Sequence, residues 1–283
     1  MEIARHGSGM RGLARALVSQ VHPVFMLPPL AASAFGAVLA REFTALIGLL
    51  HITTIFFALY TAHVKDGYVD FHLRGEDDDH PITAAGCRLA LVASSTLFFA
   101  GLLGLWWLVG VGAALLTLPA WLIAYLHAPQ LDTNPVTATT GYPLGIAVSL
   151  LGGYYVQAGD LSLVVVAFAA VFVFLLSGIK VIDDAKDYEY DRSIAKRTVA
   201  VVLGRERARI TAYALMAARL CVVLAFATLS IFPPSAALAV FAFAAVALVS
   251  RRADSELATM LLIRGSYVFL ALLVVAVWYR PFE

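Results

Sequence analysis

The chain has few charged residues and almost no cysteine. Only 14% of its 283 residues are charged, against about 25% in a typical soluble domain, while 61% are hydrophobic. Two cysteines, Cys87 and Cys221, give neither a disulfide framework nor a metal-binding spacing. A basic patch interleaved with aromatic residues, typical of nucleic-acid-binding proteins, is also missing, and the net charge is only +1. The sequence therefore predicts an integral membrane protein that binds no nucleic acid.

Apolar runs long enough to cross about 30 Å of hydrocarbon predict an all-α protein with nine transmembrane helices. The runs cover residues 21–40, 44–63, 88–108, 110–127, 141–157, 162–182, 209–231, 235–250 and 258–279. An acidic motif follows the second run and another follows the sixth. This pattern predicts two four-helix halves plus one helix, around a central cavity capped by cytoplasmic loops. We interpret residues 1–283 as a single transmembrane domain, in which residues 1–20 form a polar, basic segment suited to the membrane surface.

Both acidic motifs emerge on the same side of the membrane, because four crossings separate them. Of the 20 Lys and Arg residues, 16 fall on that side. Arg41 and Arg280 fall opposite, and Arg219 and Arg264 lie inside runs. The positive-inside rule makes the basic face cytoplasmic. We therefore expect a multi-pass protein of the cell membrane whose active site faces the cytoplasm.

The two acidic motifs share one helical spacing, i, i+3 and i+7. The members are Asp184, Asp187 and Asp191 in KVIDDAKDYEYDRSIAKRT, and His63, Asp66 and Asp70 in HVKDGYVDFHLRGEDDDHP. On a helix these positions lie within about 60° of one another, so each motif predicts one converging face. Like charges on such a face repel and lose hydration near a bilayer, so a cation is expected between them. Carboxylate oxygens suit Mg²⁺, which usually accompanies a phosphate. Neighbouring acids such as Glu76 and Asp77 are interpreted as solvated loop residues.

The second motif resembles that of the UbiA superfamily of intramembrane prenyltransferases. It contains Asp191-Arg192, Thr198 and Leu203-Gly204 in the family's places, and YLHAPQL (125–131) is similar to the family's Tyr-x-x-x-Pro-x-Leu stretch. The resemblance covers about residues 20–280. It implies a Mg²⁺-dependent prenyltransferase that moves a polyprenyl group from an isoprenyl diphosphate to a lipophilic acceptor among membrane lipids, with release of diphosphate. Quinone-precursor, glycerol-ether lipid, carotenoid and porphyrin acceptors are all compatible with the sequence.

The resemblance also implies roles for single residues. Asp66 and Asp70 would hold one Mg²⁺, and Asp184, Asp187 and Asp191 a second or third. Of these, Asp66, Asp70, Asp187 and Asp191 are the expected catalytic residues. Contacts to the diphosphate would come from Lys180, Lys65, Arg74 and His63, while Tyr125 is one aromatic candidate for stabilising the allylic cation. For Lys180, snorkelling to the membrane interface is an equal alternative.

The chain departs from the family pattern at three places. Ala62-His63 stands where the family has Asn-Asp, Asp79-His80-Pro81 replaces Asn-Arg-Pro, and Asp132 stands near the place of a basic residue. These changes leave a second reaction open, that of a UbiA-type terpene cyclase acting on a prenyl diphosphate alone. From another class, a cation transporter is an alternative, although transporters bind ions near the midplane. Residues 71–87 are predicted to form a mobile lid over the site, with Arg74 and His80 as its functional members.

Overall fold

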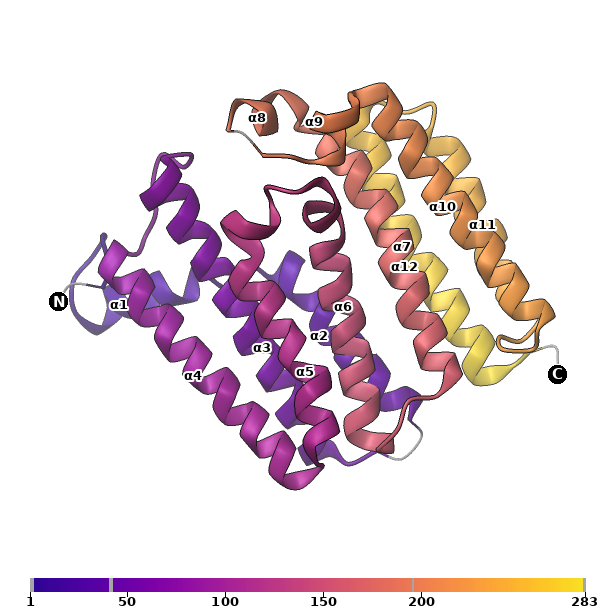
Figure 1. Ribbon diagram of the computed structural model, residues 1–283, viewed down its shortest axis with the longest axis horizontal. Coiled ribbons are helices and arrows are strands. Elements are labelled where there is room, and N and C mark those ends of the chain that lie inside the picture. Colours follow the sequence, from indigo (N-terminus) through magenta and orange to yellow (C-terminus); the bar gives the residue numbers. More distant parts are fainter. Residues whose placement is uncertain (1–2, 41–42, 195, 282–283) are drawn as a thin grey trace. The chain divides into compact units, whose positions relative to one another are not determined.

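A computed structural model of the chain describes residues 3–40, 43–194 and 196–281, which leaves the predicted outward-facing Arg41 outside the described residues. The helices are α1 (Gly9–Val18), α2 (Pro23–Leu39), α3 (Ala45–Gly67), α4 (Ala84–Leu108), α5 (Val111–Leu126), α6 (Pro135–Ala158), α7 (Leu163–Lys186), α8 (Tyr188–Ser193), α9 (Val199–Leu203), α10 (Arg205–Thr228), α11 (Ala236–Ser250) and α12 (Ser255–Tyr279), with two π-helical segments, η1 (Tyr68–Arg74) and η2 (His127–Leu131) (Figure 1). Within the described residues, one isolated bridge is the sole β contact. The all-α fold is confirmed.

Each predicted apolar run lies on one of these helices. Among the described residues, six helices are long and apolar enough to span a membrane: α3 with η1, α4, α5 with η2, α7, α10 and α12. The pair α1 and α2, bent by 65°, would make a seventh, and α11 is apolar but only 15 residues long. These lengths confirm a multi-pass membrane protein, while the count of nine spans stays a prediction.

The chain divides into two compact units, which we describe separately. Unit 1 comprises Met1–Asp132 and Leu144–Leu161, and unit 2 comprises Thr133–Pro143 and Ser162–Glu283. Each unit contains four complete long helices, and α6 is the helix divided between them. Most of α6, residues 144–158, lies in unit 1, and α12 packs against α7 and α11 inside unit 2. The single-domain assignment stays a prediction.

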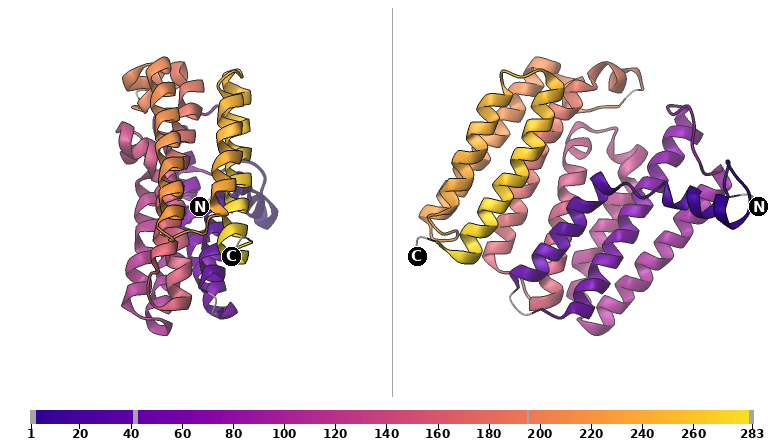
Figure 2. Two further views of the ribbon diagram at one scale, coloured as in Figure 1. Left: turned by 90° about the vertical axis from the view of Figure 1, so that its right-hand side faces the viewer. Right: turned by 180° about the vertical axis from the view of Figure 1, so that it is seen from behind.

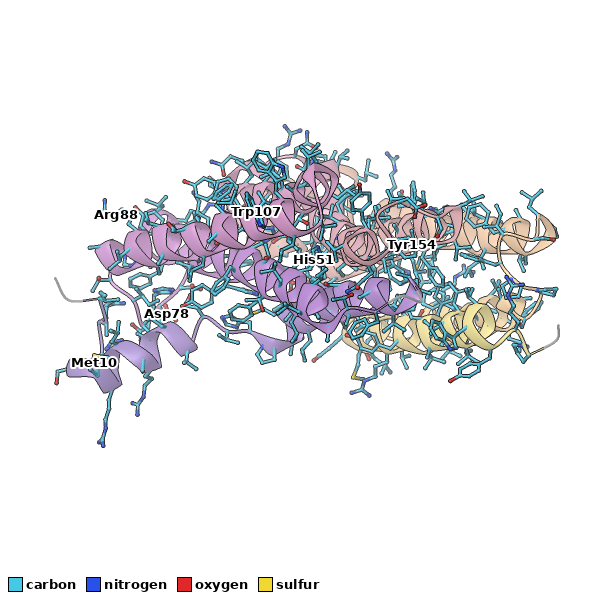
Figure 3. The ribbon with its side chains drawn as sticks, turned by 90° about the horizontal axis from the view of Figure 1, so that it is seen from below. Met10, His51, Asp78, Arg88, Trp107 and Tyr154 are labelled. Atoms are coloured by element: carbon cyan, nitrogen blue, oxygen red, sulfur yellow. The ribbon has the colours of Figure 1, made fainter. Side chains whose placement is uncertain are left out.

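Unit 1 is held together by a close crossing of α2 and α6. A Cβ on Gly36 would lie 2.1 Å from the Leu150 carbonyl oxygen, and one on Gly153 would lie 2.1 Å from the Ser33 carbonyl oxygen. Small residues of this kind let membrane helices pack backbone to backbone. Next to this crossing, the fully buried His51 Nδ1 lies 2.7 Å from the Ser33 hydroxyl (Figure 3).

Apolar side chains cover the outer surface of unit 1, as expected for a lipid-facing protein. Trp106 and Trp107, near the end of α4, are 56% and 88% exposed (Figure 3). Tryptophans at helix ends are typical of the membrane–water interface. Their position agrees with a bilayer that ends near the α4–α5 turn.

Unit 2 is built around α7, which runs beside α10 and α12 (Figure 1 and Figure 2). Helix α7 has the most apolar stretch of the six candidate spans, and two thirds of that stretch is buried. Its start is capped by Ser162, whose hydroxyl accepts the Val165 N–H at 3.3 Å. Near its other end, a Cβ on Gly178 would lie 2.7 Å from the Met216 side chain of α10. This packing fixes the end of α7 that carries the second acidic motif.

Candidate functional site

The second acidic motif is not one helical face. Helix α7 ends at Lys186, Asp187 has φ −92° and ψ 15°, and α8 begins at Tyr188. Asp184 therefore lies on α7 and Asp191 on α8, so the predicted continuous helix is wrong. Aspartate favours such a break because its side chain competes with the helical backbone for hydrogen bonds. Only Asp187 separates α7 from α8, and its carbonyl accepts a hydrogen bond from the Asp191 N–H of α8 at 2.9 Å.

Burial distinguishes the three aspartates of this motif. Asp184 and Asp191 are 4% and 6% exposed, whereas the Asp187 side chain is 51% exposed. The Lys180 ammonium group forms an ion pair with Oδ1 of Asp184. Oδ2 of Asp184 is buried and has no hydrogen-bond partner among the described residues. A buried carboxylate oxygen without a partner costs free energy, and it is the type of ligand that a hard cation takes.

Asp191 is held by residues that follow α8. Burial raises the pKa of Asp191 and Asp187 raises it further, while Lys196, Lys180 and a hydrogen bond from Thr198 oppose the shift. Thr198 is fixed because its hydroxyl also caps α9, accepting the Val201 N–H at 3.3 Å. The sequence singled out Thr198 only through the family resemblance. A threonine directly before a short apolar run is also a typical helix N-cap, and this pattern predicts its capping role.

The first acidic motif lies on a helix that continues further than predicted. Helix α3 passes directly into η1, which ends at Gly75 with φ +65°. Asp66 therefore lies on α3 and Asp70 in the π-helical segment. Because a π-helix has more residues per turn than an α-helix, the i, i+3, i+7 geometry does not hold across this junction. Asp66 and Asp70 belong to unit 1, and the aspartates of the second motif belong to unit 2.

Arg74, a predicted diphosphate ligand, is surrounded by carboxylates. Its guanidinium group donates to both oxygens of Asp132, at 2.8 and 3.1 Å, and lies 3.7 Å from Asp70 and 3.4 Å from Glu76. The Glu76 side chain is only 3% exposed, so its interpretation as a solvated loop residue is wrong. The burial of Glu76 follows from its contact with Arg74, because a partly buried guanidinium group needs negative charges nearby.

Two predicted site residues of unit 1 lie in contact. The Lys65 ammonium group lies 4.6 Å from the centre of the Tyr125 ring, within cation–π range. The Tyr125 ring also stacks with the Trp121 ring, with 5.0 Å between the ring centres. The face of Tyr125 is therefore already occupied by a positive charge.

His63 packs against a residue that sequence reasoning missed. Its ring centre lies 4.7 Å from that of His22, which precedes α2, and 6.3 Å from that of Phe25. No local pattern could pair His63 with His22, since 41 positions separate them. The structure shows no hydrogen bond from His63 to an acidic residue within its described part.

The predicted lid is a shorter loop tied to the N-terminal segment. It comprises residues 75–83, because η1 and α4 take up the rest of 71–87. Arg5 forms an ion pair with Asp79 at 2.9 Å, and the Thr83 N–H donates to the Ile3 carbonyl at 2.9 Å. His80 is buried at the centre of the loop, where burial lowers its pKa. The mobility of this loop and its closure stay predictions.

The aspartates of the two motifs form two clusters of carboxylates, one in each unit, and each cluster has a lysine nearby. In unit 1, Asp66 lies one position from Lys65, and in unit 2, Lys180 pairs with Asp184. Carboxylates can hold a divalent cation, and lysine can bind a phosphate oxygen as a point charge. The arrangement is chemically suited to an anionic substrate that binds with a metal ion.

The overall fold is similar to solved structures of intramembrane prenyltransferases. A structure of digeranylgeranylglyceryl phosphate synthase matches with a TM-score of 0.75 and 15% identity, covering 95% of this chain and 99% of that chain. A UbiA homologue from Archaeoglobus fulgidus bound to GPP and Mg²⁺ matches with 0.70 and 17%, covering 94% and 99%. An apo UbiA homologue from Aeropyrum pernix K1 matches with 0.61 and 19%, covering 88% and 99%.

Comparison at the level of sequence agrees with the fold. No curated protein matches the chain. The sequence model of the UbiA prenyltransferase family matches residues 79–273, which is more than half of the chain. The match includes the whole second acidic motif. The chain therefore belongs to the UbiA prenyltransferase family.

Proposed function

We propose that this prenyltransferase moves a polyprenyl group from an isoprenyl diphosphate to a lipophilic acceptor, with Mg²⁺ as cofactor and with release of diphosphate. The observation that carries the proposal is the buried Asp184, whose Oδ2 lacks a partner among the described residues while Lys180 holds Oδ1. A purely structural ion pair would be expected to satisfy both oxygens.

The donor set fits magnesium. Asp66 and Asp70 would hold one ion, and Asp184, Asp187 and Asp191 another, each with oxygen ligands that Mg²⁺ prefers. When bound, Mg²⁺ neutralises the charge that builds on the diphosphate as the carbon–oxygen bond breaks. In support, two structures of the Archaeoglobus fulgidus homologue are described with Mg²⁺ and a prenyl diphosphate, GPP in one and DMAPP in the other.

The remaining roles fall to side chains of this chain. Lys180 would donate a hydrogen bond to an oxygen of the leaving diphosphate, and its ion pair with the buried Asp184 supports this role because it keeps the ammonium group beside the second motif. Tyr125 would stabilise the allylic cation through its ring face, by about 0.5–2 kcal/mol. For this role the Lys65 ammonium group, which lies 4.6 Å from the ring centre, would leave the Tyr125 ring and turn to the diphosphate.

We propose that the reaction takes place in the cell membrane, at a site that faces the cytoplasm. This orientation rests on the basic residues that follow the same helix ends as the two motifs. Both the prenyl donor and the acceptor are lipids, which accounts for a multi-pass enzyme. The comparisons give no support to the cyclase alternative, and membership of the UbiA family disfavours a transporter.

The test uses the purified full-length protein in lipid nanodiscs with a prenyl diphosphate, with and without Mg²⁺ and with and without a lipid extract as acceptor. We expect diphosphate release and a prenylated lipid only when donor, Mg²⁺ and acceptor are all present. A cyclic product from donor alone would establish cyclase activity instead. Mass spectrometry of lipids from cells with and without the gene then identifies the acceptor.

A further inference from the structure

A basic pocket lies at one end of unit 2, and no aspartate of the acidic motifs lines it. It has a volume of about 590 Å³ and is lined by Arg209, Leu248, Val249, Arg251 and Arg252. Arg209 belongs to the second turn of α10, and the other four form the end of α11 and the residues after it. No proposed ligand of the metal or the diphosphate lines this pocket.

The arginines are fixed by contacts between α10 and the end of α11. The Arg209 guanidinium group donates to the Arg251 carbonyl at 2.9 Å and so caps α11. The Arg251 guanidinium group lies 5.9 Å from the centre of the Tyr213 ring. Tyr213 in turn lies within hydrogen-bond distance of Ser250, at 2.9 Å. These contacts hold two positive charges beside one another.

Within the described part of the chain, no carboxylate forms an ion pair with Arg209, Arg251 or Arg252. The acids that follow in the sequence make other contacts: Asp254 caps α12 through the Leu257 N–H at 2.9 Å, and the charge of Glu256 acts on Lys186. Three neighbouring cations repel one another. An anion in the pocket would remove this repulsion.

The position of the pocket in the membrane indicates which anion. Helix α11 has 15 residues, so it is about 22 Å long, shorter than about 30 Å of hydrocarbon. Residues that flank a short helix are drawn to the headgroup level. On the same turn, Leu248 and Val249 are 62% and 61% exposed, which gives the pocket an apolar side. A soluble phosphate would make no use of these side chains, but the acyl chains of a lipid would.

We infer that the pocket binds the phosphate headgroup of an anionic phospholipid from the surrounding bilayer. The guanidinium groups of Arg251 and Arg252 hold the phosphate, Arg209 fixes the end of α11, and Leu248 and Val249 contact the acyl chains. Basic pockets at helix ends are a recognised mode of lipid binding. This site depends on the membrane location and not on the proposed reaction.

The test compares lipid retention by charge variants of the full-length protein. The protein is moved from nanodiscs that contain phosphatidylglycerol into a neutral detergent, and bound lipids are counted by native mass spectrometry. Arg251→Gln and Arg252→Gln should each weaken retention of phosphatidylglycerol about fivefold. Arg207→Gln is the matched control, because Arg207 is an exposed arginine on the opposite face of α10. An equal loss in Arg207→Gln, or equal retention of phosphatidylcholine by the unaltered protein, would overturn the assignment.

A second measurement separates the lipid from a free anion and from a folding defect. Thermal unfolding of the unaltered protein should shift upward in phosphatidylglycerol nanodiscs relative to phosphatidylcholine nanodiscs, and inorganic phosphate should not reproduce the shift. Stabilisation by inorganic phosphate alone would contradict a lipid site. Arg251→Lys keeps the charge and the fold, so it should retain the lipid; loss of the lipid in that variant would also contradict the proposal.

Discussion

The guanidinium group of Arg74 and the carboxylate of Asp132 form a bidentate ion pair, with hydrogen bonds of 2.8 and 3.1 Å. The pair joins the end of η1 to the end of η2, 58 positions apart in the chain. Asp132 stands near the place where related enzymes often have a basic residue. Because residue 132 carries a negative charge, Arg74 has a partner, and the ion pair connects the ends of η1 and η2 in unit 1.

The Arg74–Asp132 pair predicts opposite effects of two single substitutions on substrate binding. Asp132→Asn should remove the closest of the three carboxylates around Arg74 and so lower the KM for prenyl diphosphate, whereas Arg74→Gln should raise it. Both should cost about 1.5–3 kcal/mol of stability, the usual value for a hydrogen bond to a charged group. Steady-state kinetics and thermal unfolding measure the two effects. If KM moves in the same direction in both variants, the pair serves stability alone.

Substitution within the second motif should separate metal binding from folding. Asp184→Asn and Asp191→Asn should abolish diphosphate release, because each removes a charged oxygen ligand. Asp191→Asn should also stabilise the metal-free protein, since it removes a buried charge. Asp183→Asn is the matched control: it makes the same change one position away, at a residue paired with Lys186 at 3.2 Å. Normal turnover in the Asp184 and Asp191 variants would remove these residues from the site.

The raised pKa of Asp191 predicts a specific dependence on pH. Between the ordinary value of 3.8 and the raised value, the folded protein binds more protons than the unfolded chain. Stability of the metal-free protein should therefore fall as pH rises through this window. Affinity for Mg²⁺ should rise over the same window, because only the ionised carboxylate binds the ion. Thermal unfolding and Mg²⁺ titration at several pH values measure both trends. Each trend should flatten in Asp191→Asn.

The lowered pKa of His80 predicts that acid opens loop 75–83. Burial disfavours the charged imidazole, so the stability of the closed loop is lost as pH falls below 6.5, the ordinary value. Limited proteolysis should cut the loop faster after acidification, and His80→Asn should be less sensitive to pH. His6→Asn is a control, because His6 is an exposed histidine that lies 2.9 Å from Asp79 of the same loop. Acid-induced cleavage that persists in His80→Asn contradicts the prediction.

His63→Asp introduces the aspartate that the resemblance to the UbiA superfamily implies at this place. We expect the variant to bind Mg²⁺ more tightly, because a carboxylate is a better ligand for this ion than an imidazole. Titration of Mg²⁺ against both proteins measures the difference. A metal affinity identical to that of the unaltered protein would reduce His63 to a packing residue beside His22.

Local sequence accounts for the positions of the helices. The predicted runs at 88–108 and 258–279 begin and end within four residues of α4 and α12. In a membrane, each helix must satisfy its own backbone hydrogen bonds, so a long apolar run is nearly sufficient to define it. Prediction was poorest at the polar ends, where η1 extends the second run to Arg74 and where α7 breaks at Asp187. There water, side chains and the backbone compete for the same hydrogen bonds.

By itself, the sequence determined the membrane class, the family and the identity of the acidic residues, because composition, apolar run length and motif spacing are properties of neighbouring positions. Only the tertiary structure decided which of those residues are buried and what they contact. Glu76 turned from a loop residue into a partner of Arg74, and Lys180 was assigned to Asp184. Burial and charge pairing depend on packing between segments far apart in the chain, and that information is absent from any local pattern.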